Sequence, residues 1–114
     1  MNRNNLQKPS KELALRILRD LDFKYRFEGY QIHKRKGFIP VTLYRFEEVV
    51  YYLMDDLFQV DIYKLMAWAR NSLGDAELAD RIEELSEAEV EEEERLLNLR
   101  TLMIKRLSQA MEAK

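Results

Sequence analysis

Apolar residues recur at every third or fourth position from Phe46 to the end of the sequence, and this spacing constrains the fold most strongly. It places apolar side chains along one side of an α-helix, where they can face a core. Asp61 and Asp75 are suited to cap the starts of two helices, and Gly74 is typical of the residue that follows a helix end. The sequence therefore predicts consecutive helices. Their apolar stripes are Phe46, Val49, Val50, Leu53, Met54 and Leu57; Ile62, Leu65, Met66, Ala69 and Leu73; and Leu78, Ala79, Ile82 and Leu85.

The last predicted helix is the longest. Ser86 and Glu89, three residues apart, form the pattern of a capping box, and neither glycine nor proline follows them. We therefore expect one helix over residues 86–113, about 40 Å long at the usual rise per residue. Glutamates occupy its first two turns, and basic residues follow toward its far end. This order complements the helix macrodipole.

The apolar residues of this last helix form two seven-residue series, one position apart, and together they make a broad face over residues 96–111. Such a face must be covered. It packs either on the other helices of the same chain or, across a symmetry axis, on a second copy, and the spacing leaves both open. The candidate oligomer face consists of Leu96, Leu97, Leu99, Met103, Ile104, Leu107 and Met111.

The chain ahead of these helices begins with a polar N-terminal arm, residues 1–9, and Ser10 is a suitable helix cap. Apolar residues at helical spacing predict a helix over residues 11–22. A length of 114 residues with 46% apolar content fits one domain, residues 1–114, with a single modest core. The expected fold class is mainly α, with four to five helices.

Residues 23–43 follow a different rule. Aromatic residues alternate with charged ones from Phe23 to Phe27, and apolar residues alternate again on both sides of a basic turn at residues 33–37. A period of two around a turn that ends in glycine favours a short β-hairpin. Pro40 lacks the N–H that a central strand needs, so it restricts the second arm to an edge strand or an irregular extended segment. The alternative is a helix that continues through Phe27.

Charge is sorted along the chain. Residues 1–45 carry eleven Lys and Arg against four acids, and residues 46–114 carry eight against seventeen. Much of the acidic excess lies in residues 75–94, where helix caps and a helix dipole account for it. In residues 24–36 cations are mixed with aromatic side chains, as in nucleic-acid sites, although a solvated turn is the plainer interpretation. The candidate partner or nucleic-acid contacts are Lys24, Arg26, Tyr30, Lys34, Arg35 and Lys36.

The composition argues against enzyme chemistry. The chain has no cysteine, and its one histidine, His33, cannot supply a histidine-based metal site. The acid pairs Glu47–Glu48 and Asp55–Asp56 lack the spacing of all-carboxylate Mg²⁺ sites, because Tyr51 stands where a third acid is needed. We expect no catalytic residue, cofactor or metal. A metal-dependent enzyme that uses helix-borne acids is the third and last option.

Residues 68–82 contain Trp68, then Leu-Gly-Asp at residues 73–75 and Glu-Leu-Ala at residues 77–79. This stretch resembles an element of small uncharacterised prokaryotic helical domains. The resemblance implies a helical module and no activity. Trp68 lies one position off its apolar stripe and is expected at the edge of the core.

These observations predict a non-enzymatic interaction or assembly module, a homo-oligomer formed through its C-terminal helix. We expect a protein partner, first of all a second copy, with contacts that pair the basic N-terminal half with an acidic surface. The alternative is a nucleic-acid-associated small regulator that uses the basic aromatic hairpin. The first residues lack the apolar core of a signal peptide and no stretch is long enough to span a membrane, so a cytoplasmic location is expected.

Overall fold

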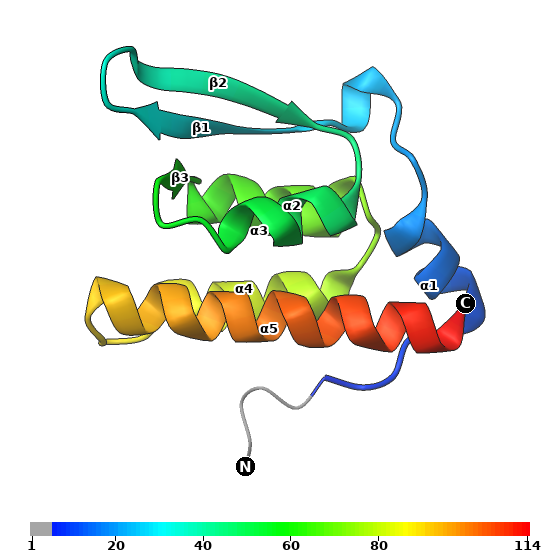
Figure 1. Ribbon diagram of the computed structural model, residues 1–114. Coiled ribbons are helices and arrows are strands. Elements are labelled where there is room, and N and C mark those ends of the chain that lie inside the picture. Colours follow the sequence, from blue (N-terminus) through cyan, green and yellow to red (C-terminus); the bar gives the residue numbers. More distant parts are fainter. Residues whose placement is uncertain (1–5) are drawn as a thin grey trace.

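The computed structural model describes residues 6–114, which form five α-helices and a small antiparallel sheet (Figure 1). The helices are α1 (Lys11–Leu18), α2 (Phe46–Leu53), α3 (Ile62–Asn71), α4 (Ala76–Glu87) and α5 (Glu92–Ala113), with a 3-10 turn, η1 (Phe23–Tyr25). The strands are β1 (Phe27–His33), β2 (Gly37–Leu43) and β3 (Phe58–Gln59). The five helices fall within the expected four to five, and the long C-terminal helix is confirmed. With 58% helix and 15% strand, the fold is mixed α and β rather than purely α.

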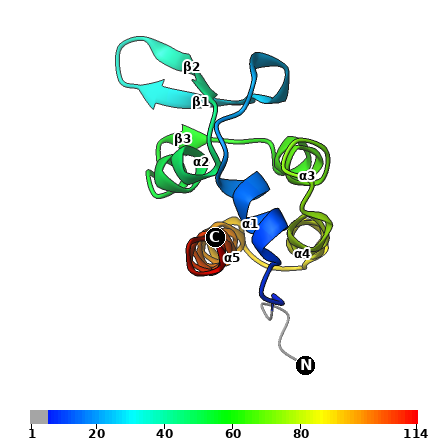
Figure 2. The same ribbon diagram turned by 90° about the vertical axis from the view of Figure 1, so that its right-hand side faces the viewer.

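The elements are arranged in three tiers. The sheet lies at the top of Figure 1, α2 and α3 lie beneath it, and α4 and α5 form the lowest tier, with α1 packed on α5 (Figures 1 and 2). The molecule measures 44 × 35 × 21 Å. Because helices are about 10 Å across, a body only 21 Å thick leaves every helix with a face toward solvent.

Trp68 joins the upper two tiers. It is buried, its ring lies against Phe27 and Phe46 at centroid distances of 5.3 and 6.4 Å, and its Nε1–H donates to the carbonyl oxygen of Tyr25 at 2.7 Å. The hydrogen bond satisfies the indole donor, which allows the ring to be buried. Trp68 therefore lies within the core rather than at its expected position on the edge.

The hairpin is confirmed, and the helix that would continue through Phe27 is wrong. β1 and β2 pair in register from Phe27↔Leu43 to His33↔Gly37, and β2 is an edge strand, as Pro40 requires. Helix α1 ends at Leu18, four residues before the expected boundary. The reason is tertiary: the backbone N–H of Leu21 donates to the carbonyl oxygen of Tyr44 at 2.8 Å, beside the hairpin.

The third strand was not expected from the sequence. β3 pairs with β1 through Tyr30↔Gln59 and Gln31↔Phe58, and the Phe58 ring lies on Gly29. A Cβ atom at residue 29 would lie 2.5 Å from Cζ of Phe58, so the close approach of the ring requires glycine there.

The expected capping box is wrong. Ser86 lies inside α4 and its hydroxyl donates to the carbonyl oxygen of Glu83, while α5 starts at Glu92 rather than at residue 86. Between the two helices the chain turns back, and the guanidinium of Arg95 donates to the carbonyl oxygens of Leu85 and Val90. Arg95 thus satisfies acceptors that a continuous helix would have satisfied internally.

A buried ion pair fastens α5 to the start of α4. The guanidinium of Arg106 donates to both carboxylate oxygens of Asp75, at 2.7 and 2.9 Å, and both side chains are fully buried. Asp75 also caps α4 through the N–H of Leu78. Arg106 donates in addition to the carbonyl oxygen of Gln7. The chain at residues 6–9 is therefore packed against the helices and is not a free polar arm, and its first residue, Leu6, is buried. Residues 1–5 of the expected arm lie outside the described residues.

Candidate interaction surfaces

The hairpin turn carries three exposed cations in succession. Lys34, Arg35 and Lys36 connect β1 to β2, and within residues 6–114 none of them forms a salt bridge. His33 orders the turn, because its Nδ1 accepts from the backbone N–H groups of Arg35 (3.2 Å) and Lys36 (3.3 Å). Gly37 has φ +72°, a conformation that favours glycine. The three charges are therefore held on a defined turn, and no acidic side chain among the described residues pairs with them.

Two aromatic rings lie on the solvent side of the same hairpin. Tyr30 is 47% exposed and Phe38 is 67% exposed, and their rings meet edge to face with centroids 6.3 Å apart and an interplanar angle of 88°. Tyr30 lies opposite Pro40, and Phe38 lies opposite Ile32 two pairs further along the ladder, so both rings are on the same face of the hairpin. The sequence-based contact set included Tyr30 but not Phe38. The alternation of β2 would have placed Phe38 beside Tyr30 once the register was known.

The other two expected contact residues lie at the base of the hairpin. The guanidinium of Arg26 lies 3.9 Å from the Phe23 ring centroid and pairs with Glu28 at 2.6 Å. The ammonium of Lys24 lies 4.9 Å from the Tyr25 ring centroid. The charge of Arg26 is therefore already balanced locally. The structure brings Tyr30, Lys34, Arg35 and Lys36 together and places Lys24 and Arg26 apart from them.

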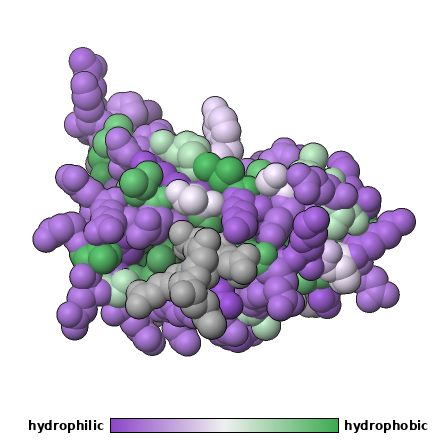
Figure 3. Space-filling model, turned by 90° about the horizontal axis from the view of Figure 1, so that it is seen from below, coloured by the Kyte–Doolittle hydropathy of each residue, from purple (hydrophilic) through white to green (hydrophobic). Residues whose placement is uncertain are grey.

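Helix α5 divides the expected oligomer face into two sets. Leu99 and Met103 are buried within the chain, so their assignment to an oligomer face is wrong; Leu96 and Leu107 are half-buried. The second heptad series faces solvent: Leu97 is 60%, Ile104 48% and Met111 43% exposed. We call these three residues the α5 stripe. Figure 3 views the lowest tier from below, and there hydrophobic surface forms separate areas on a largely hydrophilic face.

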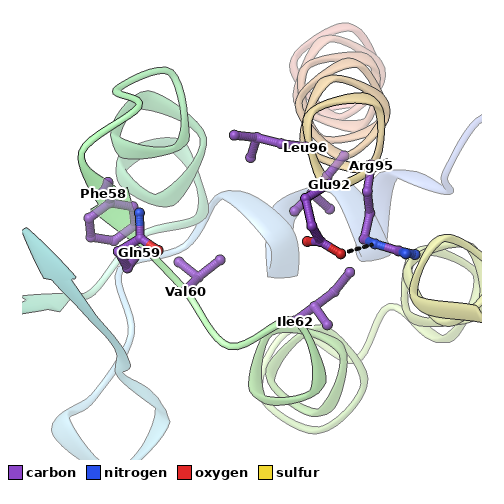
Figure 4. A pocket seen from close by; sticks show the side chains of 8 residues that line it. Phe58, Gln59, Val60, Ile62, Glu92, Arg95 and Leu96 are labelled. Carbon is purple, nitrogen blue, oxygen red and sulfur yellow. Dashed lines mark hydrogen bonds and ion pairs between the residues drawn. The ribbon is translucent and has the colours of Figure 1, made fainter. Parts of the chain in front are cut away.

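A hollow of about 280 Å³ lies between β3, the start of α3 and the start of α5. In Figure 4, Phe58, Val60 and Ile62 lie across from Leu96, with the ion pair of Glu92 and Arg95 beside them. Its volume falls below the range of about 300–1,000 Å³ typical of small-molecule sites. The arrangement explains why Leu96 is half-buried and does not define a ligand.

The part of the chain that the structure covers holds no group of three or more His, Cys, Asp or Glu placed to bind a metal ion. Within the same residues, no helix is long and apolar enough to cross a membrane. Comparisons with protein-family models, curated proteins and solved structures find no match to this chain.

Proposed function

We propose that this protein is a non-enzymatic assembly module that self-associates through the α5 stripe. The observation that carries the proposal is the seven-residue spacing of Leu97, Ile104 and Met111, all of them exposed on the longest helix. Seven-residue apolar spacing is the pattern by which helices pack along one another. A second copy offers the same spacing, so the stripe is complementary to itself.

The charge of α5 favours an antiparallel pair. Its first turn holds Glu92, Glu93 and Glu94. In a parallel pair the two acidic turns would lie side by side and repel each other. In an antiparallel pair they lie at opposite ends of a helix about 33 Å long, well beyond the Debye length of about 8–10 Å. Reversal about Ile104 places Leu97 of one copy opposite Met111 of the other, because each is seven residues from Ile104.

The size of the stripe sets the expected affinity. Stable interfaces bury about 800 Å² on each partner, and one narrow stripe on one helix provides less. We therefore expect a reversible dimer that forms in the micromolar range or above.

The first test is sedimentation equilibrium from about 10 μM to 1 mM, which spans complexes of this strength. The mean mass should rise from 13.7 kDa toward twice that value. Ile104→Lys should keep the protein monomeric, because it opposes two charges at the centre of the pair. Leu15→Lys, which changes a similarly exposed leucine on α1, is the matched control and should dimerise normally. A monomer at 1 mM would contradict the proposal, as would an equal effect of the two variants.

The second test determines the orientation of the two helices by disulfide cross-linking. Because the sequence has no cysteine, the introduced cysteines are the only thiols that can react. In an antiparallel pair, Leu97→Cys protein mixed with Met111→Cys protein should form a mixed disulfide dimer under mild oxidation. Leu97→Cys alone should stay largely monomeric. Efficient disulfide formation by Leu97→Cys alone would show a parallel pair instead.

A further inference from the structure

The exposed side of the β1–β2 hairpin combines two kinds of chemistry within one short ribbon. A pair of aromatic rings, Tyr30 and Phe38, faces solvent, and the turn at one end of the ribbon carries Lys34, Arg35 and Lys36. We propose that this face binds single-stranded nucleic acid, with bases stacked on the rings and phosphates held by the turn. The activity is independent of self-association through the α5 stripe.

The rings are suited to stacking because they are both exposed and oriented. Their edge-to-face contact at 88° fixes each ring against the other, so that little side-chain freedom is lost when a base stacks on them. Stacking of bases on aromatic side chains is tolerant of sequence, since every base has a π face. The expected ligand is therefore a flexible strand rather than one particular sequence.

The turn supplies the complementary charge. Its three cations have no salt-bridge partner within residues 6–114, and the contacts from His33 hold the backbone that carries them. Residue 34 lies four positions from Tyr30, which is about 13 Å along a strand. A segment of a few nucleotides can reach both, as in single-strand binding grooves.

The acidic residues are placed so that a bound nucleic-acid strand would stay on the hairpin. The acid on the same ribbon, Glu28, is paired with Arg26 at 2.6 Å. The acidic helices α4 and α5 form the opposite tier of the molecule, as both ribbon views show (Figures 1 and 2). In a duplex the faces of the bases are already stacked on one another, so Tyr30 and Phe38 would have nothing to bind. We therefore expect a preference for single strands over duplex.

The test is fluorescence anisotropy of the full chain with end-labelled 20-nucleotide oligo(dT) and oligo(rU), and with a duplex of equal length, in about 50 mM salt and upward. We expect binding to both single strands that weakens steeply with salt, and at least tenfold weaker binding to the duplex. Comparison of the two strands shows whether the protein distinguishes DNA from RNA. Tyr30→Ala and Phe38→Ala should each weaken binding by about 5- to 150-fold, while Tyr30→Phe, which keeps the ring, should bind as the native protein does.

A charge-matched pair of double variants tests the turn. Lys34→Ala/Lys36→Ala should reduce the slope of log affinity against log salt by about 1.4, because each phosphate contact on a single strand contributes about 0.7. Lys8→Ala/Lys11→Ala removes two exposed cations elsewhere and should leave the slope unchanged. Ile104→Lys, which blocks self-association, should leave binding intact.

Several outcomes would overturn the proposal. They are the absence of binding to either oligonucleotide at 50 mM salt, equal affinity for duplex, and binding that Tyr30→Ala and Phe38→Ala leave unchanged. Tighter binding to vesicles with anionic lipid, or to a poly-glutamate peptide, would assign the hairpin to a membrane surface or an acidic protein instead. Unaltered thermal unfolding of each variant shows that a loss of binding is not a loss of fold.

Discussion

The hairpin and helix α5 both expose apolar side chains, yet for different geometric reasons. On β1, neighbouring residues point to opposite sides of the sheet, so burial of Phe27 on one side leaves Tyr30 on the other. On α5, two seven-residue series lie one position apart, so burial of Met103 turns Ile104 toward solvent. In both regions the exposed set follows from the buried set. The two surfaces differ in chemistry. The hairpin carries aromatic rings and cations that form no salt bridge within residues 6–114, whereas α5 carries aliphatic side chains that follow an acidic first turn.

The largest expected effect tests whether the two regions belong to one cooperative unit. Arg106→Ala leaves Asp75 buried without its partner, and we expect a loss of about 3–5 kcal/mol in the free energy of unfolding. Hydrogen exchange should show faster opening of β1 and β2 as well as of α5.

The control for this variant is Arg81→Ala. Arg81 pairs with Glu84 at 2.7 Å near the surface, where such pairs contribute about 0–1 kcal/mol. Urea denaturation followed by circular dichroism compares the two variants. A hairpin that keeps its protection in Arg106→Ala would show that the two surfaces fold independently.

The second prediction separates the two series of α5 by a matched pair of leucines. Leu99→Ala should destabilise the protein by about 2–5 kcal/mol, because it opens a cavity in the core. Leu97→Ala, two residues away and exposed, should change the free energy of unfolding by less than about 0.5 kcal/mol and should weaken only the dimer. Thermal unfolding in dilute solution and sedimentation at high concentration measure the two effects. Similar losses of stability in both variants would contradict the division of α5 into buried and exposed sets.

The smallest effect concerns the hairpin turn. His33→Ala removes the acceptor for the N–H groups of Arg35 and Lys36, and we expect these two amide protons to exchange faster. The cost in global stability should be about 0.5–1 kcal/mol, since the bonds are long and exposed. His33→Asn offers an oxygen acceptor in place of the nitrogen and should exchange more slowly than His33→Ala. Unchanged exchange in His33→Ala would mean that the turn is ordered without the imidazole.

Local signals predicted much of this fold. Asp61 and Asp75 cap helices as expected, and Gly74 takes φ +72° after α3. Pro40 lies on an edge strand because its ring removes a donor wherever it stands. Each of these features depends on interactions between residues that are close together in the sequence.

The errors all involve partners that are distant in sequence. The two residues of β3 are too few for any periodic signal, and they pair with β1 where the Phe58 ring packs on Gly29. Ser86 and Glu89 have the spacing of a capping box, yet Arg95 satisfies the carbonyl of Leu85 and the helix continues past Ser86. The set of candidate contact residues on the hairpin included Tyr30 but not Phe38. Phe38 could be placed beside Tyr30 only after the pairing of β1 with β2 was known.

Because Trp68 is buried, its fluorescence is an intrinsic probe of the structure around it. Trp68 is the sole tryptophan in the sequence, so the intrinsic indole emission comes from one place. That place is the joint between α3 and the entry to β1, where the indole N–H is bonded to Tyr25 and the ring lies between Phe27 and Phe46. A red shift in emission would therefore report that the sheet has separated from the helices, without any added label.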